Sequence, residues 1–353
     1  MTGKSPESDF ATRLLNWWQF HGRHDLPWQR HRTPYRVWIA EIMLQQTQVA
    51  TVIPYFERFM ATFPDLESLA RADLDEVLAH WSGLGYYARA RNLHAAAGRC
   101  LAEHDGQLPD DSAALEALPG IGPSTANAIV AQAFDRRAPI LDGNVKRVLA
   151  RHAGIEGWPG RTAVLRRLWA EADTLTPSDR AADYTQAVMD LGATVCTPRR
   201  PDCRRCPVAE DCRAHLEDRT DQLPAQKPKR KKPRRSTTIL IVENPHGHIL
   251  LQRRPPTGIW GGLWSLPEAG DIDALPAGDA LEPPEPICHQ FTHFTLDIQF
   301  ERIGVDEDTL VADGEDGCWM SPERALECGL PQPIRRAIEA LGQTAAGSKG
   351  AVS

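Results

Sequence analysis

Leu118-Pro119-Gly120-Ile121-Gly122-Pro123-Ser124-Thr125 separates two stretches whose apolar residues recur at helical spacing. Residues 112–117 before it predict a short helix, and the second proline of the stretch suits the first position of another helix. The N–H groups at that helix start lack partners within the helix, so they suit a phosphate anion, which Gly120 and Gly122 allow to approach closely. A Gly-x-Gly alone is more typical of a helix stop with no ligand. Asp142 downstream and the residues around it reverse that preference.

The length and the charge distribution of the chain limit the number of domains and the kind of binding partner. At 353 residues the chain is long enough for two or three domains. Residues 236–353 carry 7 Lys/Arg against 18 Asp/Glu, whereas residues 1–235 carry 33 against 29, so a polyanionic partner suits the first part and not the second. No apolar run reaches the length of a membrane span, and the polar residues 1–9 do not resemble a signal peptide. We expect a cytoplasmic protein with no membrane partner.

The composition divides the chain into a helical part, a linker and a β-rich part. Residues 1–218 have apolar residues at three and four spacing, which predicts helices. Residues 219–236 interleave Lys and Arg with proline, so we expect an extended linker. Residues 237–343 read as an α+β domain, and we expect residues 344–353 to form a disordered tail. The β-rich runs are 237–242, 248–251 and 294–300, and a helix is predicted over 333–341.

Four of the eight cysteines form a cluster with Cys-x6-Cys-x2-Cys-x5-Cys spacing, which is typical of a metal site in a reducing compartment. Four thiolates suit a [4Fe–4S] cluster or a tetrahedral zinc ion. Zinc ribbons usually pair two Cys-x2-Cys knuckles, and only one interval here has that spacing, so iron–sulfur is favoured over zinc. Nearby arginines favour a structural loop on phosphates over an electron-transfer site. The cysteines are Cys196, Cys203, Cys206 and Cys212, and the arginines are Arg199, Arg200, Arg204, Arg205 and Arg213.

Two carboxylates stand in contexts that suit acid–base chemistry. Thr33-Pro34 predicts a helix start, and Glu41 lies two turns into that helix on a mostly apolar face. Desolvation there raises the pKa of a carboxyl and lets it donate a proton near neutrality. An ion pair with Arg36 or Arg89 is the alternative for this residue. Asp142 is also a candidate helix N-cap, a role compatible with catalysis, and one protonated and one ionised carboxyl suit the cleavage of a glycosidic bond.

Together these motifs resemble the A/G-specific adenine DNA glycosylases of the MutY family. The resemblance covers residues 16–341, nearly the whole chain. It implies an all-α helix-hairpin-helix glycosylase domain with an iron–sulfur cluster loop, followed by an α+β Nudix-like domain. Within the first domain it implies a six-helix barrel over residues 30–135 and a cluster subdomain from residues 1–29 and 136–218. The motifs are Leu26-Pro27-Trp28, residues 41–47, residues 83–87, the hairpin, Asp142-Gly143-Asn144 and the cysteine spacing.

The resemblance also implies the reaction. Members of the family excise undamaged adenine mispaired with 8-oxoguanine, and with guanine more weakly, in base excision repair of double-stranded DNA. By this resemblance Glu41 protonates adenine N7, Asp142 stabilises the cationic sugar by its charge or a transient covalent link, and Asn144 supports Asp142. The base must first leave the stack, because the duplex hides N7 and the sugar carbon. We therefore expect a monomer with a [4Fe–4S] cluster that works on the DNA of a bacterial nucleoid.

Further residues match positions that contact DNA or substrate in the family. Leu44, Gln46 and Tyr86 match positions that wedge into the duplex and hold the 8-oxoguanine strand, and ordinary packing is the alternative for Leu44 and Tyr86. Trp28 and Gln29 match the lining of the adenine pocket, where some relatives carry arginine in place of the glutamine.

The hairpin also bears on strand cleavage. Gly120, Gly122 and Ser124 match the part of the family that grips DNA. In the related endonuclease III group a lysine at the position of Ser124 attacks the sugar and cuts the strand through a Schiff base. An alcohol cannot form an iminium, so Ser124 predicts base removal without lyase chemistry. Lys146 lies nearby in the sequence motif and is a possible source of slow adventitious cleavage.

The second domain resembles a Nudix fold at residues 259–268. Residues 269–282 lack the clustered glutamates that hold magnesium in a working Nudix hydrolase, so we expect no such hydrolysis. His289-Gln290-Phe291-Thr292-His293 matches the family's reader of 8-oxoguanine, where serine is usual at Thr292. Threonine keeps the hydroxyl and stiffens χ1. A strand edge with buried histidines is the alternative for this segment.

Three rival functions remain open from the sequence. The first is a pyrimidine-lesion glycosylase with lyase activity of the endonuclease III type. The second is a mispair sensor that binds DNA without catalysis, and the third is a Nudix nucleotide hydrolase. Excision, strand cleavage and pyrophosphate release distinguish them.

Overall fold

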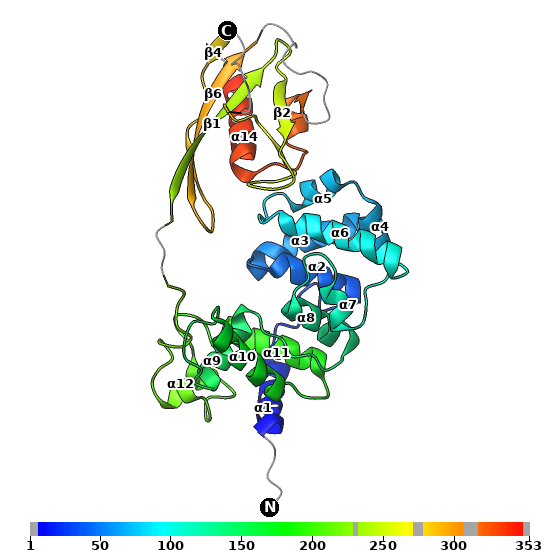
Figure 1. Cartoon of the computed structure of the whole chain (residues 1–353), viewed down its shortest axis with the longest axis vertical. Helices are drawn as coiled ribbons and strands as arrows, with labels where there is room; N and C mark the ends of the chain where they lie inside the picture. Colours follow the sequence, from blue (N-terminus) through cyan, green and yellow to red (C-terminus); the bar gives the residue numbers. More distant parts are fainter. Residues whose placement is uncertain (1–5, 229–231, 271–277, 306–316, 349–353) are drawn as a thin grey trace, which may run out of the picture. The chain divides into compact units, whose positions relative to one another are not determined.

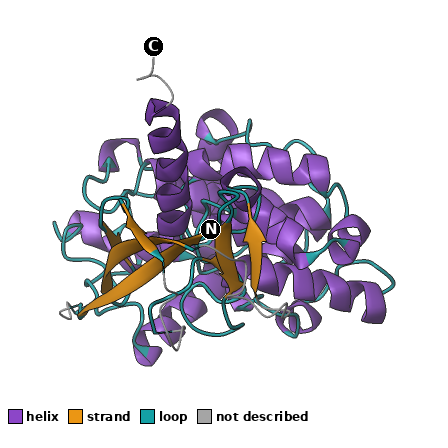
Figure 2. Ribbon diagram, turned by 90° about the horizontal axis from the view of Figure 1, so that it is seen from above, coloured by secondary structure: helices purple, strands orange, loops and turns teal. Residues whose placement is uncertain are grey.

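The computed structural model describes residues 6–228, 232–270, 278–305 and 317–348. The chain forms two compact units (Figure 1). The first contains Met1–Ala70 and Ala95–Lys229, and the second contains Arg71–His94 and Arg230–Ser353. The strands, orange in Figure 2, are accompanied by many more helical segments, and among the described residues all strands come from the C-terminal part of the chain. None of the described helices is long and apolar enough to cross a membrane.

Helices build the first unit, as the sequence predicts. A hydrophobic core joins the N-terminal helix to three later ones through residues such as Leu14, Val148, Leu168 and Val188. The helices are α1 (Pro6–His21), α2 (Pro34–Leu44), α3 (Val49–Thr62), α4 (Leu66–Arg71), α6 (Ala88–Glu103, which begins in the second unit), α7 (Ser112–Glu116), α8 (Pro123–Phe134), α9 (Gly143–His152), α10 (Thr162–Leu175), α11 (Ala181–Thr194), η1 (Cys203–Arg205) and α12 (Arg213–Leu216).

Local capping explains where the helices near the site begin. Thr33 caps α2 because its Oγ1 accepts a hydrogen bond from the N–H of Arg36 at 3.3 Å, and proline follows as the first helical residue. The hairpin between α7 and α8 turns at Gly120, whose φ of +77° favours glycine. The predicted helices on both sides of the hairpin, and the predicted start of α2, are confirmed.

A mixed sheet forms the centre of the second unit. Its path is β3-β2-β1-β6-β4, with β5 also paired to β6 and β7 also paired to β2. β1 and β6 run parallel over ten residues each, and the other pairs are antiparallel. The strands are β1 (Arg234–Glu243), β2 (Ile249–Arg253), β3 (Trp264–Ser265), β4 (Asp279–Leu281), β5 (Ile287–Gln290), β6 (Thr295–Gly304) and β7 (Gly317–Met320).

Each face of this sheet has its own core. On one face Ile239 and Ile298 pack with Ile334 and Ile338 of α14 (Gln332–Ser348), and Ala325 of α13 (Pro322–Ala325) joins them. On the other face Leu240, Val242, Leu250 and Val305 form a smaller cluster. Alternating side chains of one strand thus enter two cores, as the period of two requires. The predicted α+β class is confirmed.

Residues Arg71–His94, with α5 (Leu74–Trp81), pack in the second unit and not in the first. Asp75 accepts hydrogen bonds from Arg253 and from Nε1 of Trp264, the latter at 3.2 Å. The Tyr87 hydroxyl donates to the carbonyl of Leu330 at 3.0 Å. We expected this segment in the barrel subdomain of residues 30–135, and the structure differs from that expectation. Contacts between residues so far apart in the chain leave no local pattern in the sequence.

Two boundaries differ from the sequence expectation. The expected linker at residues 219–236 is shorter, because Leu223 is buried and its carbonyl accepts from Nε of Arg151 at 2.8 Å, and because β1 already begins at Arg234. The expected tail begins too early, since α14 continues to Ser348. Residues 229–231, 271–277 and 349–353 of the predicted linker, Nudix segment and tail lie outside the described residues.

Candidate active site

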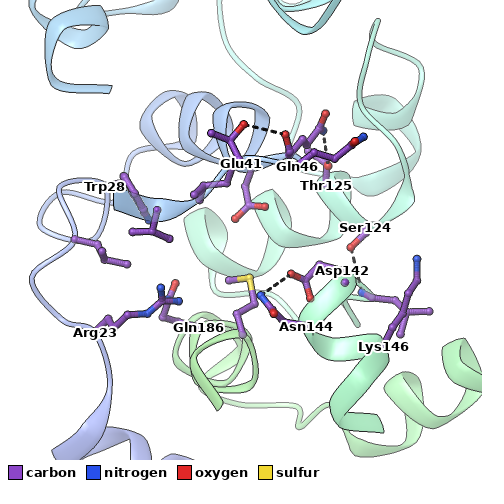
Figure 3. A pocket seen from close by; sticks show the side chains of 18 residues that line it. Arg23, Trp28, Glu41, Gln46, Ser124, Thr125, Asp142, Asn144, Lys146 and Gln186 are labelled. Atoms are coloured by element: carbon purple, nitrogen blue, oxygen red, sulfur yellow. Dashed lines mark hydrogen bonds between the residues drawn. The ribbon is translucent and has the colours of Figure 1, made fainter. Parts of the chain in front are cut away.

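A cavity of about 440 Å³ in the first unit collects most of the predicted catalytic residues (Figure 3). Its wall is formed by the loop after α1, by α2 and the loop after it, by the starts of α8 and α9, and by α11. The predicted residues on this wall are Trp28, Glu41, Leu44, Gln46, Ser124, Asp142 and Asn144, and Lys146 lies there as well.

Glu41 occupies a place that favours its protonated form. Burial raises its pKa to about 7, against the hydrogen bond that Nε2 of Gln132 donates to Oε1 at 2.9 Å, and the negative charge of Asp142 raises it further. In the part of the chain that the structure describes, Glu41 forms no ion pair with an arginine of its own unit. Arg36 donates to the carbonyl of Pro27, and Arg89 donates to the carbonyl of Gly85. Glu41 is therefore suited to give up a proton near neutral pH.

Asp142 is both the N-cap of α9 and a wall residue of the cavity. Its Oδ1 accepts from the N–H of Val145 at 2.7 Å, and its Oδ2 accepts from Nδ2 of Asn144 at 3.4 Å. Arg147 holds the amide of Asn144 in this direction, because Nη2 of Arg147 donates to Oδ1 of Asn144 at 2.9 Å. The predicted cap is confirmed, and Asn144 lies within hydrogen-bonding distance of Asp142, so its supporting role stays a prediction.

The two carboxyls differ in the neighbours that oppose the rise in pKa caused by burial. Burial raises the pKa of Asp142 above its ordinary value, although the N–H groups of Val145 and Asn144 and the cations of Arg147 and Lys146 oppose this rise. The start of a helix adds a favourable field for a negative charge. Glu41 has one neutral amide donor and faces a negative neighbour. These surroundings suit Glu41 to be the acid and Asp142 to be the anion.

Ser124 connects the hairpin to the loop that carries Asp142. Its Oγ accepts from the N–H of Leu141 at 3.1 Å, so α8 fixes the residue directly before the N-cap. Gly122 has an ordinary φ of −98°, and a Cβ built there would meet no atom within 4 Å. The fold itself therefore does not require glycine at position 122.

The remaining predicted wall residues occupy different depths. The Trp28 ring is buried with its edge toward Phe56, at a centroid distance of 5.4 Å. Leu44 ends α2 and is half-buried, and the exposed Gln46 follows with a left-handed φ of +58°, a strained conformation for glutamine. Gln29 is not on the wall, and its amide donates to Oε1 of Gln186 at 2.5 Å.

The predicted reader segment and Tyr86 lie in the second unit. The hydroxyls of Tyr86 and Thr292 are 3.2 Å apart, and both side chains are exposed. Phe291 stacks on Phe294 at 4.5 Å, and its edge contacts His289 at 4.6 Å. His289 is half-buried in this aromatic group, whereas His293 is exposed, so the segment is not a strand edge with two buried histidines.

The four cysteines of the predicted cluster line one small cavity in the first unit. Arg151, which is 2% exposed, fixes the loop that begins at Cys196. It donates to Sγ of Cys196 at 3.3 Å and to the carbonyls of Thr197 and Pro198 at 2.8 and 3.1 Å. Within the described ranges, no three His, Cys, Asp or Glu side chains are gathered as a single metal ion would need.

Sequence reasoning missed two glutamines of the site. Gln132 contacts Glu41 from α8, and Gln186 on α11 lines the cavity. Both side chains are buried, at 4% and 2% exposed. The only signal in the sequence was a polar residue among the small apolar residues of each helix, which does not specify a partner.

The helical fold, the hairpin and the paired carboxylates in one cavity define a DNA glycosylase of the helix-hairpin-helix class. Residues 39–173 match the HhH-GPD superfamily of base excision DNA repair proteins, and residues 238–340 match the NUDIX domain. A thermostable thymine-DNA glycosylase is 28% identical, with a TM-score of 0.54 over 59% of this chain and 95% of its own. Endonuclease III in a non-covalent DNA complex shares the fold at 24% identity and a TM-score of 0.50, over 59% of this chain and 94% of its own.

Relatives that match this chain over most of its length identify the family within this class. The adenine DNA glycosylase of Buchnera aphidicola subsp. Schizaphis graminum is 33% identical over 94% of this chain and 98% of its own length. The adenine DNA glycosylase of Homo sapiens is 38% identical over 89% of this chain and 70% of its own length. The chain belongs to the adenine DNA glycosylase family, and it is a base excision repair enzyme that hydrolyses an N-glycosidic bond.

Proposed function

We propose that this protein excises adenine from A:8-oxoguanine mispairs in double-stranded DNA, and from A:G mispairs more slowly, without cutting the strand. The observation that carries the proposal is the pair of carboxyls in one cavity, with the pKa of Glu41 raised to about 7 by burial. We further propose that it acts as a monomer on the DNA of a bacterial cytoplasm, in keeping with its basic first part.

The chemistry follows from the two carboxyls. Glu41 gives its proton to N7 of the flipped adenine, so the electrons of the glycosidic bond leave with a neutral base. Asp142 stabilises the positive charge that develops on the sugar, and Asn144 holds Asp142 through its amide. A water molecule then adds to the sugar carbon and releases a proton, which restores the acid form of Glu41 directly or through solvent, and an abasic site remains.

Ser124 and Lys146 bear on strand cleavage. The Ser124 hydroxyl is held by the N–H of Leu141 and carries no amine, so it cannot form a Schiff base. Lys146 also lines the cavity, and its charge lowers the pKa of the neighbouring Asp142. The alcohol of Ser124, in place of an amine, supports base removal without efficient lyase action.

Excision on a duplex with one A:8-oxoguanine pair tests the proposal, with strand breaks scored before and after alkali. Breaks that appear only after alkali support base removal alone. Breaks before alkali, with a borohydride-trapped adduct as strong as that of endonuclease III, would establish the lyase rival. Duplex binding with no breaks in either assay would establish the mispair sensor instead.

Thr292→Ala is expected to reduce the preference for 8-oxoguanine over guanine opposite adenine by about fivefold, the effect of one lost hydrogen bond. Thr292 is exposed in the reader segment, and its hydroxyl, which is 3.2 Å from the Tyr86 hydroxyl, is accessible to a lesion strand. The measurement is the ratio of single-turnover excision rates on the two mispairs.

Thr292→Ser is the matched control, because it keeps the hydroxyl and removes only the methyl group. It is expected to keep the ratio of the parent protein. An unchanged ratio in Thr292→Ala would contradict a role of this hydroxyl in reading the lesion.

The cysteine cavity fits a [4Fe–4S] cluster better than zinc. All four cysteines line one cavity, and only one of their three intervals has the Cys-x2-Cys spacing of a zinc knuckle. We propose that Cys196, Cys203, Cys206 and Cys212 hold such a cluster. When bound, it supplies a covalent anchor that fixes the loop between α11 and α12.

Cys206→Ser is expected to lower the iron and sulfide content of the purified protein and to reduce its thermal unfolding temperature. The reason is that the loop then loses one of its four covalent anchors. Cys288→Ser is the matched control, since Cys288 is an exposed thiol of the second unit. Stoichiometric zinc without iron in the parent protein would contradict the iron–sulfur assignment.

A further inference from the structure

A chain of side-chain amides connects Glu41 to the buried Asp190. Gln132 donates to Glu41 at 2.9 Å and accepts from Nε2 of Gln29 at 3.4 Å. Gln29 also donates to Gln186 at 2.5 Å, and Gln186 donates to Asp190 at 2.7 Å. Five residues from four segments of the chain are thus hydrogen-bonded in sequence. The direction of each amide in this chain can be derived from its two ends.

The first end is Asp190, which is fully buried and surrounded by donors. Its Oδ2 accepts from Nε1 of Trp18 at 2.9 Å and from the N–H of Arg23 at 2.8 Å. Its Oδ1 accepts from the Arg23 guanidinium, with Nε at 2.8 Å. An ionised carboxylate only accepts hydrogen bonds, so Gln186 must turn its NH₂ group toward Asp190 and its oxygen toward Gln29.

The second end is Arg32, whose Nε donates to Oε1 of Gln29 at 2.7 Å. A guanidinium only donates, so Gln29 must turn its oxygen toward Arg32 and its NH₂ group toward Gln186 and Gln132. The two ends therefore require the same direction for Gln29. Gln132 must then present its oxygen to Gln29, which leaves its NH₂ group for Glu41.

This direction determines which oxygen of Glu41 carries the proton. Oε1 faces a donor and acts as an acceptor, so the proton of the neutral acid resides on Oε2. Glu41 lines the cavity, and Oε2 has no hydrogen-bond partner among the residues that the structure describes. The acidic proton is consequently held on the oxygen that no described residue engages, on a side chain that lines the cavity.

We propose that Gln132 is a positioning residue that keeps the acidic proton of Glu41 on the oxygen facing the substrate, with its amide direction imposed by Asp190 and Arg32. The inference rests on the proposed function, because it concerns the proton that Glu41 delivers. It adds a residue on α8 that touches neither substrate nor reacting atoms.

The test is the pH dependence of single-turnover adenine excision by Gln132→Met, a change that keeps the length of the side chain and removes the donor. The charged groups that face Glu41 across the cavity are Asp142 and Lys146 of α9 and Arg23 of the loop after α1, and the variant leaves them in place. In the parent protein the rate is expected to fall as pH rises through about 7, where Glu41 loses its proton.

In Gln132→Met this fall is expected at higher pH, because the amide that stabilised the carboxylate is absent. The maximal rate is expected to drop about 10- to 100-fold, because the carboxyl can turn its proton away from the base. A role in packing alone lowers the rate without moving the pH profile. An unmoved profile in a folded Gln132→Met protein would overturn the proposal.

Two further variants complete the design. Gln222→Met alters an exposed glutamine of the same unit and is expected to leave rate and profile unchanged. If Gln132→Met does not fold, the test uses Gln132→Glu. This change keeps the shape of the side chain and an oxygen that can accept the hydrogen bond from Gln29. Its fall in rate must move to higher pH, and an unmoved profile again overturns the proposal. Absence of excision in the parent protein would contradict the proposed function itself. That outcome differs from an unmoved pH profile in a variant, which would contradict only the role of Gln132.

Discussion

Glu41→Gln is expected to lower the single-turnover rate of adenine excision by at least about a thousandfold while duplex binding is retained. An amide has nearly the shape of the acid but no proton to give to adenine N7. The fold is expected to persist, because Oε1 of the new side chain can still accept from Gln132 as Glu41 does at 2.9 Å. The measurements are excision scored after alkali and affinity for the same duplex.

The matched control is Glu57→Gln, an exposed glutamate of α3, which is expected to behave as the parent protein. The mispair-sensor alternative requires the opposite result, with equal behaviour of Glu41→Gln and its parent in every DNA assay. Substantial excision by Glu41→Gln would therefore remove Glu41 from the role of acid.

The pH dependence of the unfolding free energy is a second measurement that distinguishes Glu41→Gln from the parent protein. The folded-state pKa of Glu41 is about 7 against an ordinary 4.5, so the ionised form is disfavoured in the folded state. The parent protein then loses unfolding free energy as pH rises from about 4.5 to 7, by about 3 kcal/mol at most. The amide variant lacks this loss and should unfold at a higher temperature than its parent above pH 7.

Asp142→Asn is expected to reduce excision about 100- to 1000-fold, the effect of removing one preorganised electrostatic group at a developing charge. Asparagine caps helices as well as aspartate does, and its oxygen can still accept from the N–H of Val145. The unfolding free energy is therefore expected to change by no more than about 0.5 kcal/mol. Rate and unfolding measurements on one preparation separate charge from cap.

Two other variants serve as comparisons for Asp142→Asn. Asp142→Ala removes charge and cap together, and it should add about 1 kcal/mol of destabilisation to the loss of activity. Asp111→Asn makes the same chemical change at another cap, where Asp111 accepts from the N–H of Ala114 at 2.9 Å. It is expected to leave excision unchanged. Full activity in Asp142→Asn would show that Asp142 serves as a cap only.

Much of the local structure could be predicted from the sequence, because caps and turns are properties of adjacent residues. Thr33 before Pro34, the glycines of the hairpin and Asp142 before α9 act within a few residues of themselves. The β-rich runs likewise appeared where the pattern placed them. The packing of residues 71–94 in the second unit was not predictable, because its contacts, such as Asp75 to Arg253, join residues far apart in the chain.

In the active site, too, the residue types could be predicted from the sequence, whereas the contacts between distant segments could not. The sequence by itself supplied Glu41 and Asp142 as the two carboxyls and Ser124 in place of an amine. Only the tertiary structure decided that burial raises the pKa of Glu41 to about 7 and that the hydrogen-bond partner of Glu41 is Gln132. A side chain's chemistry is carried by its residue type, but its protonation state depends on burial and on partners that folding brings from distant segments.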